Sequence, residues 1–312
     1  GAAGFPPDGA EAGSYCAATE LAVSGFQSAR GLDATGVCDE QTWRALVEAG
    51  YRLGDRLLSL GAPMLRGDDV ADLQQSLNQI GFDCGRPDGI MGPATSRALE
   101  DFQRNAGVMA DGICGSQTVR VLRLMARQSG SGPGVASLRE EESARLHASM
   151  RSQRIVVGQF GGLSALGRSL ARALRERGAT VISTDEYEAA AQAAAANRFG
   201  ASLYIGFAAL VEPAARIAYF AVPAFESRGG RALATELAVT LRARHSGSPD
   251  VVGMRLPVLR ETRMPAVLCS WGPVRDVVAR IEPMTLGEVD AITSWSETPV
   301  SDVTVPGPDP AR

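Results

Sequence analysis

Few residues of this 312-residue sequence combine reactive side chains with a spacing that supports chemistry. There are only two histidines, His147 and His245, and the five cysteines include no Cys-x-x-Cys pair. Zinc sites and disulfide frameworks need clustered Cys or His residues, so the sequence predicts neither, and a reducing compartment fits best. All 31 basic residues are arginine. Schiff-base, P-loop and general-base chemistry by lysine is therefore excluded.

Cys269 and Ser270 follow an apolar segment, and a nucleophile can lie at the end of such a strand. No Gly-x-Ser-x-Gly motif surrounds the pair, and no histidine is placed to activate either side chain. Free cysteine is also among the most buried residue types. We therefore interpret Cys269 and Ser270 as part of a buried strand.

Two further patterns could bind a cofactor or a metal. A glycine-rich stretch, 158–162, precedes a helical pattern and then Asp185, which is an arrangement found in dinucleotide-binding folds. However, Phe160 and Leu163 stand where Gly-x-Gly-x-x-Gly requires glycine. The three consecutive carboxylates 140–142 are interpreted as the solvated start of a helix instead of a metal site. Neither pattern predicts a bound cofactor.

The composition is that of a soluble globular chain with two or three domains. Hydrophobic residues make up 45% and charged residues 21% of the sequence, both ordinary values. The net charge of −4 and the pI near 5.4 argue against a broad nucleic-acid-binding surface. No apolar run is long enough for a membrane span, and no signal-peptide pattern is present. We expect a cytoplasmic protein, with export left open because the sequence begins at Gly1 instead of Met.

Stretches rich in glycine, serine and proline divide the sequence. We expect a loose N-terminus (1–14), a partial helical module (15–52), a complete helical module (60–127), a linker (128–149), an α/β domain (150–295) and a disordered tail (296–312).

The helical region repeats itself at a constant offset of 76 residues. Such a fixed period predicts copies of one small structural module. A shorter repeat lies inside the second copy, where Asp-Gly-Ile occurs at 88–90 and again at 111–113. The residues paired by the long offset are Phe26 and Phe102, Gln27 and Gln103, Cys38 and Cys114, and Thr42 and Thr118.

The second copy predicts three helices. Asp68 or Asp69 can N-cap the first, whose apolar residues lie on one face as far as Ile80. The second helix covers about 93–105 with proline in its first turn, and the third begins at residue 116 or 117. Asp-Gly turns separate the elements. The result is a compact three-helix unit.

The repeated Asp-Gly-Ile-x-Gly-x-x-Thr motif and the Phe-Gln pair resemble the peptidoglycan-binding domain type 1 family. The first copy keeps only the later part of the pattern and lacks its leading helix. The resemblance implies modules that bind glycan strands in some proteins and serve as scaffolding in others. Turn geometry and packing alone require most of the motif residues, so we interpret them mainly as fold-forming. The candidate binding residues are Asp88, Gly89, Gly92, Thr95, Phe102, Gln103, Asp111, Gly112 and Thr118.

Strand and helix patterns alternate over about 154–295, which predicts an α/β sheet with helices on its faces. The fold class is therefore multidomain, with all-α three-helix modules followed by an α/β domain. The expected strands cover 154–157, 180–183, 202–207, 216–222 and 265–269, and the expected helices cover 163–177, 186–199 and 230–244.

Three segments of the α/β region resemble the N-acetylmuramoyl-L-alanine amidase 3 family. They are IVVGQFGG, SLYIGFAA and VLRETRMPAVLCSWG, and together with their order they span about 140 residues. The resemblance implies an amidase-3-like fold and, for the family, a zinc ion held by two histidines and a glutamate, with a second glutamate as base.

The family's metal-binding residues do not carry over to this sequence. The first histidine corresponds to Phe160, the second to Ala208, and the catalytic glutamate to Ser270. The glutamate ligand falls in a stretch that is missing after Gly162. Neither histidine of the chain is placed to substitute. We expect no catalytic residues, no bound zinc and no other cofactor.

Helical modules followed by a degenerate amidase domain resemble the layout of the actinobacterial CwlM-type family. That resemblance implies a cytoplasmic regulator of peptidoglycan precursor synthesis, with the UDP-N-acetylglucosamine enolpyruvyl transferase as partner. We expect a non-catalytic regulator or scaffold, without nucleic-acid or membrane partners. Two alternatives remain: a protein that binds peptidoglycan fragments, and an amidase as the family name indicates.

Overall fold

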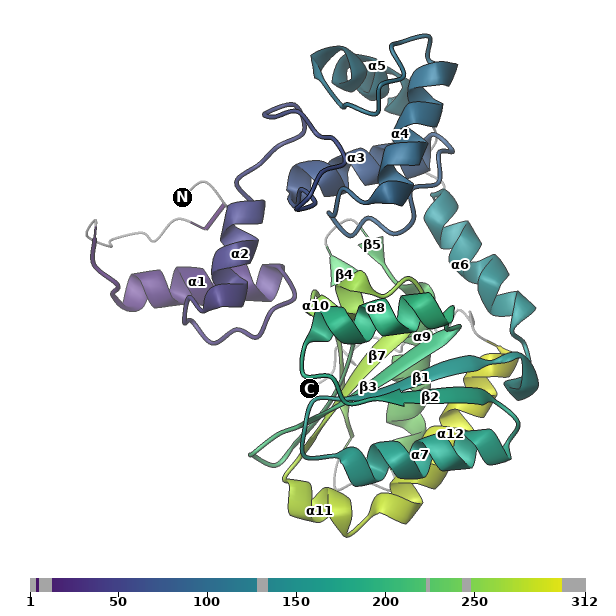
Figure 1. Cartoon of the computed structure of the whole chain (residues 1–312). Helices are drawn as coiled ribbons and strands as arrows, with labels where there is room; N and C mark the ends of the chain where they lie inside the picture. Colours follow the sequence, from purple (N-terminus) through teal and green to yellow (C-terminus); the bar gives the residue numbers. More distant parts are fainter. Residues whose placement is uncertain (1–3, 6–12, 128–133, 223–224, 243–247, 299–312) are drawn as a thin grey trace, which may run out of the picture. The chain divides into compact units, whose positions relative to one another are not determined.

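The computed structural model describes residues 4–5, 13–127, 134–222, 225–242 and 248–298 (Figure 1). The chain forms two compact units. The first comprises residues 1–139 together with 221–226 and 254–256, and the second comprises the remainder. In the described part of the chain, no helix is both long and apolar enough to cross a membrane.

The first unit contains five helices over its modules: α1 (Ala17–Ala29), α2 (Glu40–Glu48), α3 (Asp68–Gln79), α4 (Pro93–Asn105) and α5 (Ser116–Ala126). The three helices expected for the second copy are confirmed. The expected N-cap is wrong, because Gly67 holds that position and makes no side-chain cap. Asp69 lies within the first turn of α3, where its carboxylate binds Arg56 and also accepts from the Val70 N–H at 2.9 Å.

Helices α3, α4 and α5 share one hydrophobic core. Its fully buried members include Leu73, Leu99, Phe102 and Leu122. The stretch before α3 is held against the Asp-Gly turns by two isolated β-bridges, Leu58 to Cys114 and Arg66 to Ile90. The first module has a smaller core of Phe26, Leu32 and Ala45, with Phe5 packed edge-on against Phe26.

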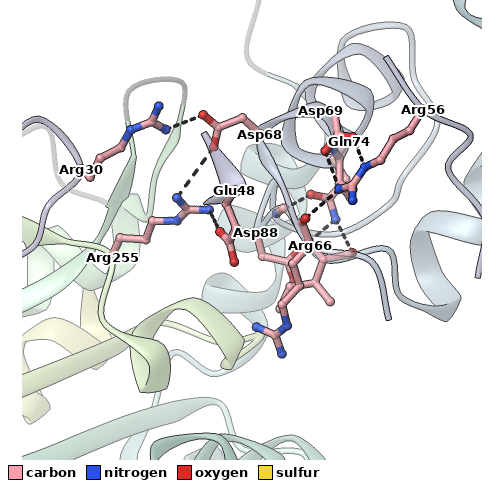
Figure 2. Close-up of polar contacts among 12 residues, drawn as sticks. Arg30, Glu48, Arg56, Arg66, Asp68, Asp69, Gln74, Asp88 and Arg255 are labelled. Atoms are coloured by element: carbon pink, nitrogen blue, oxygen red, sulfur yellow. Dashed lines mark hydrogen bonds and ion pairs between the residues drawn. The ribbon is translucent and has the colours of Figure 1, made fainter. Parts of the chain in front are cut away.

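Two groups of ion pairs lie within the first unit (Figure 2). Arg56 binds both carboxylate oxygens of the buried Asp69, at 2.7 and 3.1 Å, and also donates to the Arg66 carbonyl. In the second group, Arg255 binds Glu48 at 2.7 Å. Because Asp69 is buried, its charge depends on the guanidinium of Arg56.

The second unit is a twisted sheet with helices on both faces (Figure 1). Its strand order is β2-β1-β3-β7-β4, with β6 paired to β4; β2, β1, β3 and β7 are parallel, and β4 is antiparallel to β7. β5 pairs with the last two residues of β4, and residues 221–226, which include both, belong to the first unit. The expected α/β sheet is therefore confirmed. The strands are β1 (Arg154–Gln159), β2 (Thr180–Thr184), β3 (Leu203–Ala209), β4 (Ala214–Val222), β5 (Phe225–Glu226), β6 (Asp250–Met254) and β7 (Ala266–Gly272).

Helices cover the sheet in two groups. On one face, α12 packs against α7 and α9, and on the other α8 packs against α10. Their bounds are α7 (Ser164–Glu176), α8 (Ala189–Phe199), α9 (Arg228–Leu241), α10 (Pro257–Glu261) and α12 (Ile281–Glu297), with the short helices α11 (Val274–Val278) and η1 (Met150–Ser152) beside them.

Several elements differ from expectation: β5, β6, α10 and α11 were not predicted, and two longer helices were missed as well. Helix α6 (Val135–Leu146) lies in the stretch 128–149 that was expected to be a linker. Helix α12 was not predicted, although it carries a row of buried residues. The expected tail falls almost entirely at 299–312, outside the described residues.

Candidate functional site

The three positions that correspond to the family's zinc-binding and catalytic residues lie together at the carboxyl edge of the sheet. Ala208 on β3 and Ser270 on β7 are register partners. Phe160 follows β1, and its N–H donates to the Phe207 carbonyl at 2.9 Å, which continues the β1–β3 pairing. We call Phe160, Ala208 and Ser270 the edge positions. The fold brings them together as an α/β active site would require.

The side chains at the edge positions are a phenyl ring, a methyl group and a hydroxymethyl group, so none supplies an imidazole or a carboxylate. Arg216 on β4 is the register partner of Ser270 on the other side. Directly opposed residues on neighbouring strands share a face and have Cβ atoms about 5 Å apart. The Arg216 side chain therefore leaves the backbone on the same face of the sheet as the Ser270 side chain. Within the described residues, no group of three or more His, Cys, Asp or Glu side chains could hold a metal.

Hydrogen bonds through the Gln192 side chain join α8 to the neighbouring strands β1 and β3. The Gln192 side chain of α8 donates to the Gln159 carbonyl at 3.0 Å and accepts from the Tyr204 hydroxyl at 2.6 Å. A Cβ atom at Gly158 would collide with both Gln192 and Tyr204. Glycine at 158 thus serves this packing, and burial raises the pKa of Tyr204. The phenol is a structural donor, since at neutral pH it stays protonated.

Cys269 and Ser270 are buried at 0% and 2% exposure. Burial, reinforced by the nearby Glu288 carboxyl, raises the pKa of the Cys269 thiol well above its ordinary value. A thiol that does not ionise is a poor nucleophile. The interpretation of this pair as part of a buried strand is confirmed.

The remaining candidate groups lie away from the edge positions. The His147 ring bonds to the Ser143 carbonyl at 2.8 Å on α6, and His245 lies outside the described residues. The expectation that Glu140 belongs to the solvated start of a helix is wrong. Glu140 lies in the middle of α6, and its carboxylate accepts from the Ser227 hydroxyl and the Gly229 N–H. Its carboxylate stabilises the N-terminus of α9.

The helical modules contain the same hydrogen-bonded turn three times. In each, one buried glutamine accepts from a glycine N–H and donates to a threonine hydroxyl and to a backbone carbonyl of the turn. We call this unit the glutamine-bonded turn. Its three glycines have φ near +70°, a conformation that favours glycine. The glutamine, glycine and threonine are Gln27, Gly36 and Thr42 in the first; Gln74, Gly89 and Thr95 in the second; and Gln103, Gly112 and Thr118 in the third.

An aspartate completes the second and third turns. Asp88 and Asp111 each accept from the glutamine amide, at 2.8 and 3.0 Å, and from a backbone N–H two residues later. These bonds lower the pKa of Asp111. In the first turn Thr35 takes this place, with its hydroxyl 3.2 Å from the Gln27 amide. The polar groups of the repeated motif are therefore largely occupied by one another.

The candidate binding residues divide by exposure. Phe102, Gln103, Thr95 and Thr118 are buried, so they hold the modules together from within. Asp111 is exposed, whereas Asp88 and Gly92 are half-buried at the surface of their turn. Gln74, which bonds the second turn, was not among the candidates. Gln74 and its threonine are 21 residues apart in the sequence, whereas Gln103 and its threonine are 15 residues apart, so the 76-residue offset did not reveal Gln74.

The comparisons with known proteins agree with this architecture. Residues 2–46 and 66–122 match the family described as "Putative peptidoglycan binding domain". The match begins upstream of residue 15, where the first module was expected to start. The helical modules are therefore similar to this family over these residues, and the α/β domain follows them along the chain.

The relatives confirm the resemblance to the CwlM-type family. The chain is 46% identical over 147 residues to the N-acetylmuramoyl-L-alanine amidase CwlM of Mycobacterium tuberculosis, a match covering 46% of this chain and 36% of that protein. It is 32% identical over 146 residues to the amidase CwlL of Bacillus licheniformis, covering 40% of each. The chain thus matches well under half the length of both relatives. An amidase structure from Clostridium difficile 630 aligns with 47% of this chain and 98% of its own at 15% identity, with a TM-score of 0.40.

Proposed function

We propose that this protein is a non-catalytic pseudo-amidase that regulates or scaffolds peptidoglycan synthesis. The observation that most directly supports this proposal is the identity of the side chains at the edge positions. Phe160, Ala208 and Ser270 converge where the amidase 3 family holds its metal and its base, but two of the three have no donor atom at all. Catalytic zinc needs about three nitrogen or oxygen protein ligands, so these residues do not fit zinc.

Two neighbouring features support loss of hydrolysis. Arg216, an arginine instead of a metal-binding residue, is the register partner of Ser270, and Cys269 is buried with a raised pKa. A metal-activated water needs ligands, and a covalent route needs an accessible nucleophile. The proposed activity is therefore binding. The resemblance to the CwlM-type layout makes the UDP-N-acetylglucosamine enolpyruvyl transferase the proposed partner, and the cytoplasm the proposed location.

Metal analysis and hydrolysis assays test this proposal. Purified protein equilibrated with zinc and then desalted should retain far less than one equivalent, and it should release no stem peptide from muropeptides. An active zinc amidase of the same family is the positive control. Stoichiometric zinc at the edge positions together with peptide release would refute the proposal. Failure to recover the transferase from cytosol with the tagged full chain would refute the proposed partner.

Binding to peptidoglycan is the second candidate function, and the family match of the modules favours it. Because the glutamine-bonded turns occupy their own polar groups, a glycan would have to contact exposed residues around them. Leu57 and Met64 are exposed beside Gly115 and Gly92 of the turns. Co-sedimentation with purified sacculi tests this function. Binding that is lost in Leu57→Asp and Met64→Asp, but retained in Leu124→Asp on the exposed side of α5, would support it.

A further inference from the structure

A cavity of about 270 Å³ opens at the carboxyl ends of β1 and β2, beside the first turns of α7. It lies wholly in the second unit and includes none of the edge positions. Buried residues of β1 and the buried Gly167 form its inner wall. The lining residues are Val157, Gly158, Gln159, Ser164, Gly167, Arg168, Ser183, Thr184 and Asp185.

Two opposite charges line this cavity. Arg168 comes from α7 and Asp185 follows β2, and both side chains are exposed. Among the described residues, neither makes an ion pair or a hydrogen bond with another residue. By contrast, Arg175 of α7 bonds the Val181 carbonyl at 2.9 Å. The cavity therefore presents one cation and one anion that the protein itself does not neutralise.

Three hydroxyl groups add hydrogen-bonding capacity. Ser164, Ser183 and Thr184 line the same cavity, and their hydroxyls make no hydrogen bond within the described part of the chain. A hydroxyl can both donate and accept, so these groups can serve either charge of a ligand. Val157 supplies an apolar part of the wall.

We propose that this cavity binds a small zwitterion of the amino-acid type. Arg168 binds the carboxylate, Asp185 binds the ammonium group, and the hydroxyls complete the hydrogen bonds. A phosphate or nucleotide would be repelled by Asp185, and a simple cation by Arg168. The volume lies just below the usual 300–1,000 Å³ of small-molecule pockets, which excludes a dinucleotide. This inference does not depend on the proposed regulatory function.

Titration of the full chain by NMR with alanine, in both enantiomers, and with serine and dialanine tests the proposal. At least one of these should cause saturable shifts at the backbone amides that line the cavity, at low millimolar concentration. Alaninamide lacks the carboxylate and N-acetylalanine lacks the ammonium group. Each should bind at least about tenfold more weakly than alanine, because a hydrogen bond to a charged group contributes about 1.5–3 kcal/mol.

Charge-neutralising variants identify the binding groups. Arg168→Gln and Asp185→Asn should each weaken the binding at least about tenfold. The matched controls Arg172→Gln, on the exposed side of α7, and Glu186→Gln, next to Asp185, should bind as the wild type does. Absence of saturable shifts with all four probes overturns the proposal. Equal binding by the Arg168 and Asp185 variants, with spectra that show them folded, overturns it as well.

Discussion

Glu288 on α12 should make the second unit less stable as the pH rises. Its side chain is fully buried, and neither carboxyl oxygen has a hydrogen-bond partner in the described part of the chain. Burial raises the pKa of Glu288 well above its ordinary value. The hydroxyl of Thr285, one turn earlier, is also buried without a partner. The folded state therefore holds Glu288 as a neutral acid.

The sign follows from linkage between protonation and folding. In the unfolded chain Glu288 ionises near its ordinary pKa of about 4.3, whereas in the folded state it keeps its proton to higher pH. Its full contribution to stability is present below about pH 4.3 and is lost as pH rises toward the folded pKa. Each pH unit in this window lowers the free energy of unfolding by about 1.4 kcal/mol. The loss ends where the pH reaches the raised pKa of the folded state.

Glu288→Gln removes this titration while it keeps the shape of the side chain. The difference in unfolding free energy between the variant and the wild type should therefore grow as the pH rises from 5, by up to about 1.4 kcal/mol for each pH unit below the folded pKa. Urea unfolding followed by tryptophan fluorescence measures it, because Trp271 and Trp295 are buried in this unit. Other titrating groups cancel in the difference. Glu282→Gln, at an exposed position of the same helix, is the control and should run parallel to the wild type. Parallel curves for Glu288→Gln would refute the reasoning.

Three further predictions concern the first unit and the thiols. Gln103→Leu should lower the stability of the modules by about 2–3 kcal/mol, because it leaves the Gly112 N–H buried without an acceptor; circular dichroism in urea measures this, and Gln117→Leu is the exposed control. Arg56→Met should cost about 3 kcal/mol by leaving the charge of Asp69 buried and unpaired, whereas Arg44→Met, in an exposed pair, should cost under about 0.5 kcal/mol. Three thiols should react with Ellman's reagent only after unfolding; rapid labelling of them in the native protein would contradict their burial. The three thiols are those of Cys84, Cys114 and Cys269. Burial raises the pKa of Cys114 to about 12.

The sequence predicted those parts of the fold that depend on local rules. The helices of the second module were found because proline, glycine and Asp-Gly turns mark their ends. The edge positions were found through the resemblance of three segments to the amidase 3 family, and their convergence agrees with the meeting of parallel strand ends at one edge of a sheet. Ala208 and Ser270 are far apart in sequence, yet their pairing follows from the order of the strands.

Features set by tertiary contacts were beyond sequence reasoning. Helix α12 mixes polar and apolar residues around its surface, and a charged residue such as Glu288 normally marks an exposed position. The contact of Glu140 with the start of α9 involves residues that lie 87 and 89 positions further along the sequence. The cavity between Arg168 and Asp185 likewise joins two elements whose residues give no local pattern.

The glutamine-bonded turns also give the modules three internal reporters of local opening. The N–H groups of Gly36, Gly89 and Gly112 are held by side-chain amides at 2.8, 2.8 and 2.9 Å. Turn amides normally exchange their hydrogen quickly with solvent. These three can exchange only when the hydrogen bond to their glutamine side chain breaks. Deuterium uptake at each glycine would thus measure how often its own turn opens. A partner that binds the first module should slow exchange at Gly36 alone, whereas a partner that binds the second module should slow exchange at Gly89, at Gly112 or at both.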